Sequence, residues 1–200
     1  VAQDISEEYG GKGLDLYEIL AMAEEFYRAD AGIGLTLMLA SFGAEIVEEH
    51  GSEEQKEEFL RPVAENDQIT GLAVSEPDTG SDLAGMTTSA ERDDENGEWV
   101  LNGEKYWVGN AVEADWLTIY AKTGDDPDNR YGNYSMFILP TDAPGYHAEH
   151  IPEKMGFRAS KQGHIVLDDC RIPEDHLIGA EGGGFYMLAE FFNHGRVVVA

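Results

Sequence analysis

The stretch LAVSEPDTGSD, residues 72–82, decides most of the fold prediction. Its apolar start is typical of a strand. Pro77 and Gly80 then predict a turn, because proline fixes φ and glycine lets the backbone approach a ligand closely. The hydroxyls of Ser75 and Ser81 flank that turn. Such an edge can hold a flat-ring cofactor, but the local chemistry by itself favours a plain connection between a strand and a turn.

A second stretch, LNGEKYWVGNA at residues 101–111, predicts a tight turn and then a short strand. Asn102 and Gly103 tolerate the positive φ angles of a hairpin turn. Trp107 follows in the strand as a tryptophan of the buried type. A tryptophan can fix a flat ring by packing on its face, whereas an isolated strand tryptophan more often fills a core.

The composition predicts a folded and very acidic protein. The chain has 200 residues, of which 42% are hydrophobic and 10% aromatic, enough to build a core. It carries 40 acidic and 13 basic residues, a formal net charge of -27. Nucleic acid and anionic membrane surfaces need clustered basic residues, so neither is predicted as a partner. Such a surface resembles that of proteins from extreme halophiles, where salt screens the self-repulsion.

Other features of the sequence predict a cytoplasmic protein without metal. No apolar run reaches the ~18 residues of a membrane span, and no signal peptide opens the chain. The one cysteine, Cys170, rules out an intrachain disulfide. No metal site is predicted, because His147 and His150 lie three apart in a strand-like region and therefore face opposite sides.

The hydrophobic pattern divides the chain into three regions of an α+β fold. Residues 1–68 are expected to be the end of an N-terminal helical domain, in which a capping box at Ser52 and Gln55 starts the third helix. Residues 69–178 carry short β-rich runs at regular spacing, which predict a small antiparallel β-sandwich or barrel as the middle domain. Residues 179–200 are expected to be the first helix of a C-terminal helix bundle. The β-rich runs are 70–74, 87–91, 99–101, 105–108, 116–121, 135–139, 146–151 and 164–167.

In their order and spacing, the two opening stretches resemble the middle β-domain of the acyl-CoA dehydrogenase family. The resemblance continues over nearly the whole chain, in EEYGGKG (7–13), GSEEQK (51–56), MGFRAS (155–160), DCRIP (169–173) and GAEGGGF (179–185). It implies an FAD-dependent enzyme that removes an α-proton and a β-hydride from an acyl-CoA thioester. It also implies an electron-transfer flavoprotein as acceptor and a full-length parent that is a homodimer or homotetramer.

The resemblance assigns site residues position by position. The cofactor-binding set is Leu72, Ala73, Val74, Ser75, Glu76, Pro77, Asp78, Thr79, Gly80, Ser81, Trp107, Val108 and Gly109. The substrate-binding set is Ser81, Asn193, His194, Gly195 and Arg196.

The chain departs from the family at positions that bear on the chemistry. The family usually has Thr or Ser where this chain has Gly109, so here only a backbone N–H could serve flavin N5. Some members carry the catalytic glutamate where this chain has Gly195, and most carry it in the C-terminal domain. No catalytic base is therefore assigned within these residues. Neither end of the chain has a cap, so the sequence is expected to be a piece of a longer protein, inactive alone, with the base beyond residue 200.

Two alternative functions stay open at this point. An acyl-CoA oxidase or a flavin monooxygenase could use the same scaffold, and oxygen consumption would separate them from a dehydrogenase. A catalytically silent binding domain is the alternative from a different class.

The charge predicts that the folded state depends on salt. At millimolar salt the unscreened repulsion among 40 acidic side chains should lower the melting temperature well below its value in molar salt. Melting curves followed by circular dichroism at the two salt concentrations check this. An unchanged melting temperature would contradict it.

Overall fold

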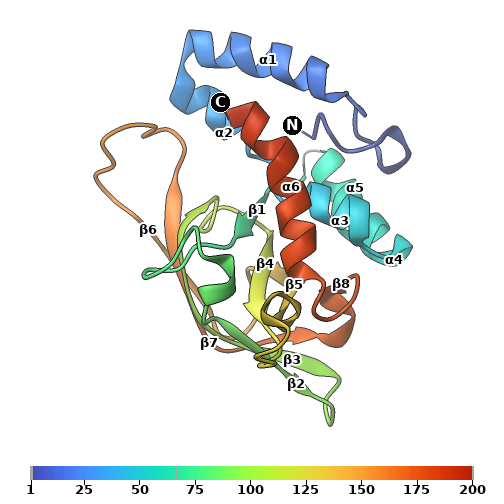
Figure 1. Ribbon diagram of the computed structural model, residues 1–200. Helices are drawn as coiled ribbons and strands as arrows, with labels where there is room; N and C mark the ends of the chain where they lie inside the picture. Colours follow the sequence, from blue (N-terminus) through green and yellow to red (C-terminus); the bar gives the residue numbers. More distant parts are fainter. Residues whose placement is uncertain (1, 66, 200) are drawn as a thin grey trace.

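The fold is α+β, with helices at both ends of the sequence and a mainly antiparallel sheet between them (Figure 1). The computed structural model describes residues 2–65 and 67–199, and the side chains of residues 194 and 199 lie outside the described part. This architecture confirms the fold class that the sequence predicted. None of the helices in the described residues has both the length and the apolar composition that crossing a membrane requires.

The helices before the sheet begin where the sequence places their caps. α1 (Leu16–Ala29) starts at Asp15, whose carboxylate accepts a hydrogen bond from the backbone N–H of Glu18 at 2.9 Å. The predicted capping box at Ser52 and Gln55 is confirmed. The remaining helical segments are α2 (Ala31–Met38), α3 (Ala44–His50), α4 (Glu53–Gln55), a π-helical turn (Lys56–Leu60) and α5 (Arg61–Ala64).

The strands of the described residues form one sheet in the order β6-β7-β3-β2-β4-β5-β8, and β1 pairs with β4 from outside this path. The strands are β1 (Thr70–Ala73), β2 (Ser89–Asp93), β3 (Glu98–Gly109), β4 (Trp116–Lys122), β5 (Tyr134–Pro140), β6 (Tyr146–His150), β7 (Gln162–Pro173) and β8 (Leu177–Ile178). β1 runs parallel to β4, with Thr70 opposite Trp116, whereas the sequence predicted antiparallel strands only.

The predicted hairpin turn at Asn102 and Gly103 is wrong. Both residues lie inside β3, which joins the two predicted runs 99–101 and 105–108 into one strand. Gly103 has φ +141° and sits at a shift in register against β7. A Cβ there would lie 2.7 Å from the Cα of Thr88, so the glycine serves a close backbone approach at a bulge rather than a turn.

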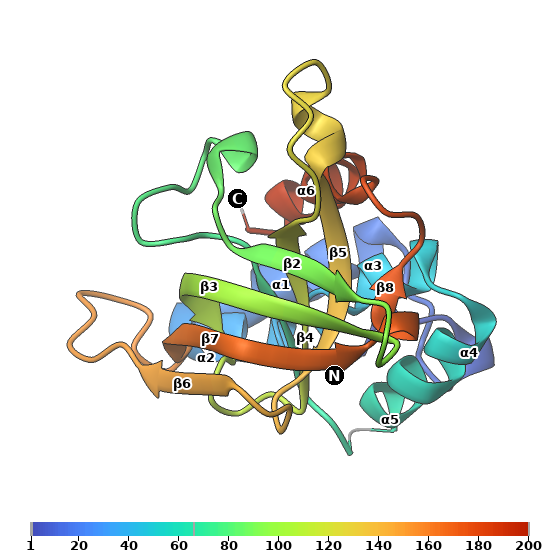
Figure 2. The same cartoon turned by 90° about the horizontal axis from the view of Figure 1, so that it is seen from below.

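The sheet folds over so that each face of β4 meets a separate core. Figure 2 shows β2, β3 and β7 crossing in front of β4 and β5. Between these two layers Trp99 packs edge-on against Phe137, with ring centroids 5.1 Å apart. On the other face, Trp116 packs against Phe59 from the helices at 5.6 Å. β4 is therefore buried on both sides, which explains why its sequence shows no alternation of apolar and polar residues.

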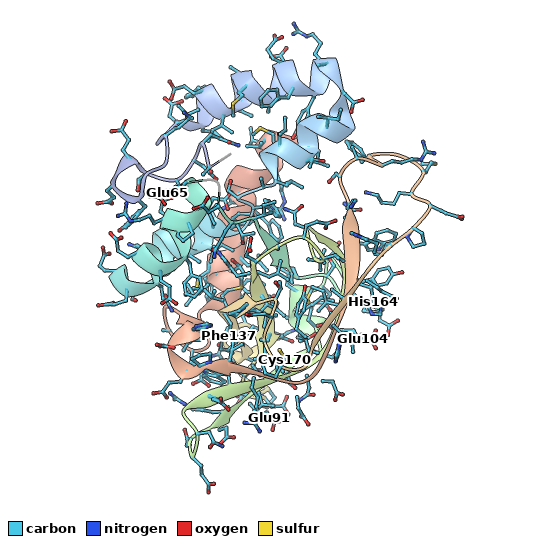
Figure 3. All side chains as sticks on the ribbon, turned by 180° about the vertical axis from the view of Figure 1, so that it is seen from behind. Glu65, Glu91, Glu104, Phe137, His164 and Cys170 are labelled. Carbon is cyan, nitrogen blue, oxygen red and sulfur yellow. The ribbon has the colours of Figure 1, made fainter. Side chains whose placement is uncertain are left out.

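The outer face of the front layer is polar. His164 of β7 and Glu104 of β3 lie side by side on this face, with Nε2 and a carboxylate oxygen 2.9 Å apart (Figure 3). Phe137 and Cys170 belong to the inner core. This alternation of polar and apolar positions is the period of two that a strand with one solvated face shows.

The last helix, α6 (Gly184–Val199), joins the sheet to the first helices (Figure 1). It starts so close to β5 that a Cβ on Gly184 would lie 2.7 Å from the carbonyl carbon of Ser135. Further along, Leu188 is fully buried and Phe191 packs edge-on against Phe42 with ring centroids 5.1 Å apart. These contacts fix the path of α6 along the helical side of the sheet.

Gly71 of β1 has no room for a side chain, and it gives a test of the fold. A Cβ on Gly71 would lie 2.5 Å from the carbonyl oxygen of Gly109 and 2.9 Å from Cδ2 of Leu117. Gly71→Ala should therefore destabilise the protein by about 1–3 kcal/mol through overpacking.

Gly156→Ala is the matched control, because a Cβ there meets nothing within 4 Å. It should change the free energy of unfolding by less than about 0.5 kcal/mol. Denaturant melts of both variants measure the difference. Equal stability of the two variants would show that the contact between Gly71 and Gly109 is not as close as described.

Candidate functional site

A cleft of about 390 Å³ brings together segments that lie far apart in the sequence. One side is the chain that follows β1, and the other side is α6. The lining residues are Phe42, Gly80, Ser81, Leu83, Phe191, Phe192, Gly195 and Arg196. Four of these, Gly80, Ser81, Gly195 and Arg196, belong to the site residues that the sequence predicted.

The loop after β1 has a closed turn at its centre and an exposed tip. The backbone N–H of Glu76 donates to the carbonyl of Thr79 at 2.8 Å, and the N–H of Thr79 donates back at 3.3 Å. Pro77 lies inside this turn, as its fixed φ favours. Gly80 and Ser81 follow it and are exposed.

Backbone donors of this loop are available to a ligand. Within residues 2–65 and 67–199, no hydrogen bond of the structure uses the N–H of Ser75, Gly80 or Ser81. A Cβ on Gly80 would lie 3.9 Å from Oγ of Ser75, so the two residues face each other across the loop. This edge can donate several hydrogen bonds to the oxygen and nitrogen atoms of a flat polar ring.

The remaining predicted cofactor residues of this stretch serve mainly as its support. The side chains of Leu72, Ala73 and Val74 are buried in the two cores, so these residues could reach a ligand only through main-chain atoms. Asp78 is exposed at the tip, and Thr79 is half-buried.

A buried ion pair joins this loop to β3. The ammonium of Lys105 is 3.0 Å from a carboxylate oxygen of Glu76 and donates to the carbonyl of Val74 at 2.9 Å. Lys105 is 0% exposed and Glu76 is 7% exposed. The carboxylate also accepts from the N–H and hydroxyl of Thr87 at 2.8 and 2.9 Å and from the N–H of Thr88 at 2.9 Å.

Both members of the pair are charged at neutral pH. Burial acts to raise the pKa of Glu76, but the Lys105 ammonium and the donors from Thr87 and Thr88 outweigh it and lower the pKa to about 2. Burial lowers the pKa of Lys105 to about 8, although the Glu76 carboxylate opposes that fall. A buried charged pair is costly unless hydrogen bonds satisfy it, and here the Lys105 ammonium contacts Glu76, the Val74 carbonyl and, at 3.9 Å, Sδ of Met86.

The sequence did not predict the role of Lys105, although it holds a signal for it. Trp99 and Leu101 are buried, and the period of two along β3 places Lys105 on the same inner face. A lysine at an inward position of a strand requires a buried partner. Only the folded chain shows that the partner is Glu76.

Trp107 is exposed, and its prediction as a buried tryptophan is wrong. It is 55% exposed, with φ +62°, at a bulge where β3 shifts register against β7 between Lys105 and Val108. The bulge turns the indole outward while Val108 stays buried. A left-handed backbone at a bulky residue costs about 1–3 kcal/mol, and such strain is concentrated at functional sites.

Two sets of hydrogen bonds hold the end of β3 beside the loop. The backbone N–H of Tyr106 donates to the carbonyl of Ser75 at 2.7 Å. The side-chain amide of Asn110 donates to the carbonyls of Leu39 and Thr70 at 2.8 and 2.9 Å. Gly109, half-buried between them, is thereby fixed against β1 and the end of α2.

The predicted substrate residues on α6 differ in their relation to the cleft. Gly195 and Arg196 line the cleft, and the Arg196 guanidinium lies 5.3 Å from the ring centre of Phe192. Asn193 is exposed and does not line the cleft. The predicted role of His194 concerns a side chain outside the described part of the molecule.

A second cavity of about 270 Å³ lies between α1, α3 and α6 and was not predicted. It shares Phe42, Phe191 and Gly195 with the cleft, so the two hollows are neighbours. Burial and the Asp4 carboxylate raise the pKa of Glu45 on its wall well above the usual range. Within residues 2–65 and 67–199, no group of three or more His, Cys, Asp or Glu side chains is placed to hold a metal ion.

Comparison with known proteins identifies the family. The model of the acyl-CoA dehydrogenase N-terminal domain matches residues 1–67, and that of the acyl-CoA dehydrogenase middle domain matches residues 71–170. The mitochondrial short-chain specific acyl-CoA dehydrogenase of Mus musculus is 34% identical over 201 residues, which cover 100% of this chain and 48% of the relative. The chain therefore belongs to the acyl-CoA dehydrogenase family, as the resemblance predicted.

Solved structures agree with this assignment. The acyl-CoA dehydrogenase from Geobacillus kaustophilus superposes with a TM-score of 0.92 at 28% identity, over 99% of this chain and 52% of that one. An acyl-CoA dehydrogenase complexed with FAD from Bacillus anthracis has a TM-score of 0.88 at 34% identity, over 98% of this chain and 33% of that one. The chain spans about half the length of the curated relatives it matches.

The buried pair gives a test that depends on pH. Glu76→Gln leaves the Lys105 ammonium without its counter-ion, which should cost about 3–5 kcal/mol at neutral pH. Because the folded pKa of Glu76 lies below its ordinary value, its contribution is complete above about pH 4.5 and is lost as the pH falls toward 2. The stability gap between wild type and Glu76→Gln should therefore narrow across this range.

Chemical denaturation at several pH values measures that gap. Glu98→Gln is the control, since Glu98 forms a partly exposed pair with Arg171 at 2.8 Å and should cost less than about 1 kcal/mol. A gap for Glu76→Gln that stays constant from neutral pH to pH 2 would contradict the charge assignment.

Proposed function

We propose that the protein binds FAD along the loop after β1 and catalyses the α,β-dehydrogenation of an acyl-CoA thioester. The observation that carries the proposal is the exposed Trp107, held by a bulge one residue from the bond between Tyr106 and Ser75. That bond ties together the two segments that the sequence assigned to the cofactor. Membership of the acyl-CoA dehydrogenase family and the relative solved with FAD support the same assignment.

The residues present fit a flavin ring. The free N–H groups of Ser75, Gly80 and Ser81 suit the polar edge of the ring, and Gly80 leaves room for it. The Trp107 indole offers an apolar face for packing. When bound, FAD supplies the acceptor for the hydride. The residues that would hold FAD are Leu72–Ser81 and Trp107–Gly109. Within the second range, Gly109 would contribute its backbone N–H.

The substrate would enter the cleft between the loop and α6. Ser81 and Arg196 face this cleft from opposite sides, and the Arg196 guanidinium offers N–H donors to the oxygen atoms of the CoA part. Asn193, His194 and Gly195 complete the set proposed for the acyl-CoA. Donors near the thioester carbonyl would stabilise the negative charge that develops when a base takes the α-proton. By resemblance, that base is a glutamate outside these residues.

Other properties are proposed on the same basis. The chain would comprise the end of an N-terminal helical domain (1–68), the middle β-domain (69–178) and the first helix of a C-terminal domain (179–200). The electron acceptor would be an electron-transfer flavoprotein, and the assembly a homodimer or homotetramer. The charge of -27 supports a cytoplasmic protein of an organism that accumulates salt.

The test uses the complete polypeptide that carries this sequence. The polypeptide is loaded with FAD and kept under anaerobic conditions. Addition of acyl-CoA thioesters of graded chain length should bleach the flavin absorbance near 450 nm, because the ring accepts the hydride. Trp107→Ala should weaken FAD binding about tenfold, the loss expected from about 1.4 kcal/mol of ring packing.

Trp99→Ala is the matched control. Trp99 is 2% exposed in the core, so this variant should lower the melting temperature while its folded fraction retains FAD. No bleaching with any acyl-CoA, or equal loss of FAD in both variants, would overturn the proposal. Rapid oxygen consumption by the reduced protein would instead identify an oxidase or a monooxygenase.

A further inference from the structure

We propose that Lys105 and Glu76 are positioning residues, which hold the two flavin-facing segments at a fixed separation from inside the protein. This inference rests on the proposed flavin site. Neither side chain is free to touch a ligand, because both are buried and their polar atoms are bonded to each other, to the Val74 carbonyl and to Thr87 and Thr88. Their effect must therefore pass through the loop after β1 and through β3.

The pair joins three segments at one point. The carbonyl of Val74 comes directly after the last residue of β1, where pairing with β4 has ended, and Lys105 supplies its donor at 2.9 Å. The Glu76 carboxylate accepts from Thr87 and Thr88, which lead into β2. Lys105 itself belongs to β3. One buried contact thus sets the loop relative to both neighbouring strands.

The far limb of the loop is anchored in the same core. Tyr120 stacks on Tyr134 with ring centroids 4.9 Å apart, and the Lys105 ammonium lies 5.9 Å from the Tyr120 ring. The hydroxyl of Tyr134 hydrogen-bonds to the carbonyls of Ala84 and Met86 at 2.8 and 3.1 Å. Both limbs are thereby fixed, while the tip of the loop carries the exposed residues Pro77, Asp78, Gly80, Ser81 and Asp82.

Stability alone does not account for a buried charged pair. Replacement of such a pair by apolar side chains of similar volume is often neutral or stabilising. What the apolar replacement cannot supply is a donor for the Val74 carbonyl or an acceptor for Thr87 and Thr88. Lys105 is also two residues before Trp107, so a shift of the loop relative to β3 changes the spacing between the loop donors and the indole.

The deciding experiment uses the double variant Lys105→Met, Glu76→Met in the complete polypeptide. Its melting temperature should fall less than that of Glu76→Gln, because no charge stays buried alone, although the Val74 carbonyl and the N–H groups of Thr87 and Thr88 lose their partners. Hydrogen exchange at the backbone N–H of Glu76, Thr79 and Tyr106, measured without FAD, should become at least tenfold faster. FAD should bind at least tenfold more weakly, because the loop is no longer preorganised.

Arg171→Met is the matched control, since Arg171 forms partly exposed ion pairs with Glu98 and Asp93 at the other end of β3. It should leave both readouts within twofold of wild type. A stable double variant with exchange and FAD binding unchanged would overturn the proposal. If the wild type does not bind FAD, the proposed function fails, while the exchange rates still decide whether the pair positions the loop.

If the double variant does not fold, a milder variant still tests the proposal. Thr87→Val removes one hydroxyl donor to Glu76 from an exposed residue. Exchange at Glu76 and Thr79 should then rise at least twofold, and rates equal to wild type would overturn the proposal.

Discussion

The contact between the Lys105 ammonium and the Glu76 carboxylate is the constraint on which the candidate site depends. β1 has only four residues, and its ladder with β4 ends at Ala73, beyond which one backbone hydrogen bond from Tyr106 to Ser75 ties the loop to β3. The buried pair replaces that missing ladder with charge-assisted hydrogen bonds, which are shorter and stronger than neutral ones. The exposed tip can then present free backbone donors without itself being packed.

Two irregularities of β3 complete the arrangement. Gly103 lets the strand pass close to Thr88, and the bulge before Val108 turns Trp107 out of the core. A regular strand would bury an aromatic residue or leave it on the polar outer face. The bulge instead keeps the strand in its ladder while the indole is exposed at the end that Tyr106 and Asn110 fix.

The sequence predicted those parts that depend on local chemistry. The cap at Ser52 and most strand positions follow from residue preferences over a few positions. The exposure of Trp107 and the position of Gly103 inside β3 do not follow from residue preferences, because a bulge is a property of two paired strands. The pair of Lys105 with Glu76 spans 29 residues, and no local pattern names its partner. The family resemblance proposes the site residues, but it does not show what holds them.

The most direct test of the central claim is a crystal structure of the complete polypeptide with FAD and a thioether analogue of an acyl-CoA. We expect the flavin ring against the Trp107 indole, its polar edge on the N–H groups of Ser75 to Ser81, and the analogue between Ser81 and Arg196. Flavin bound elsewhere, or a Trp107 indole without contact to the ring, would contradict it.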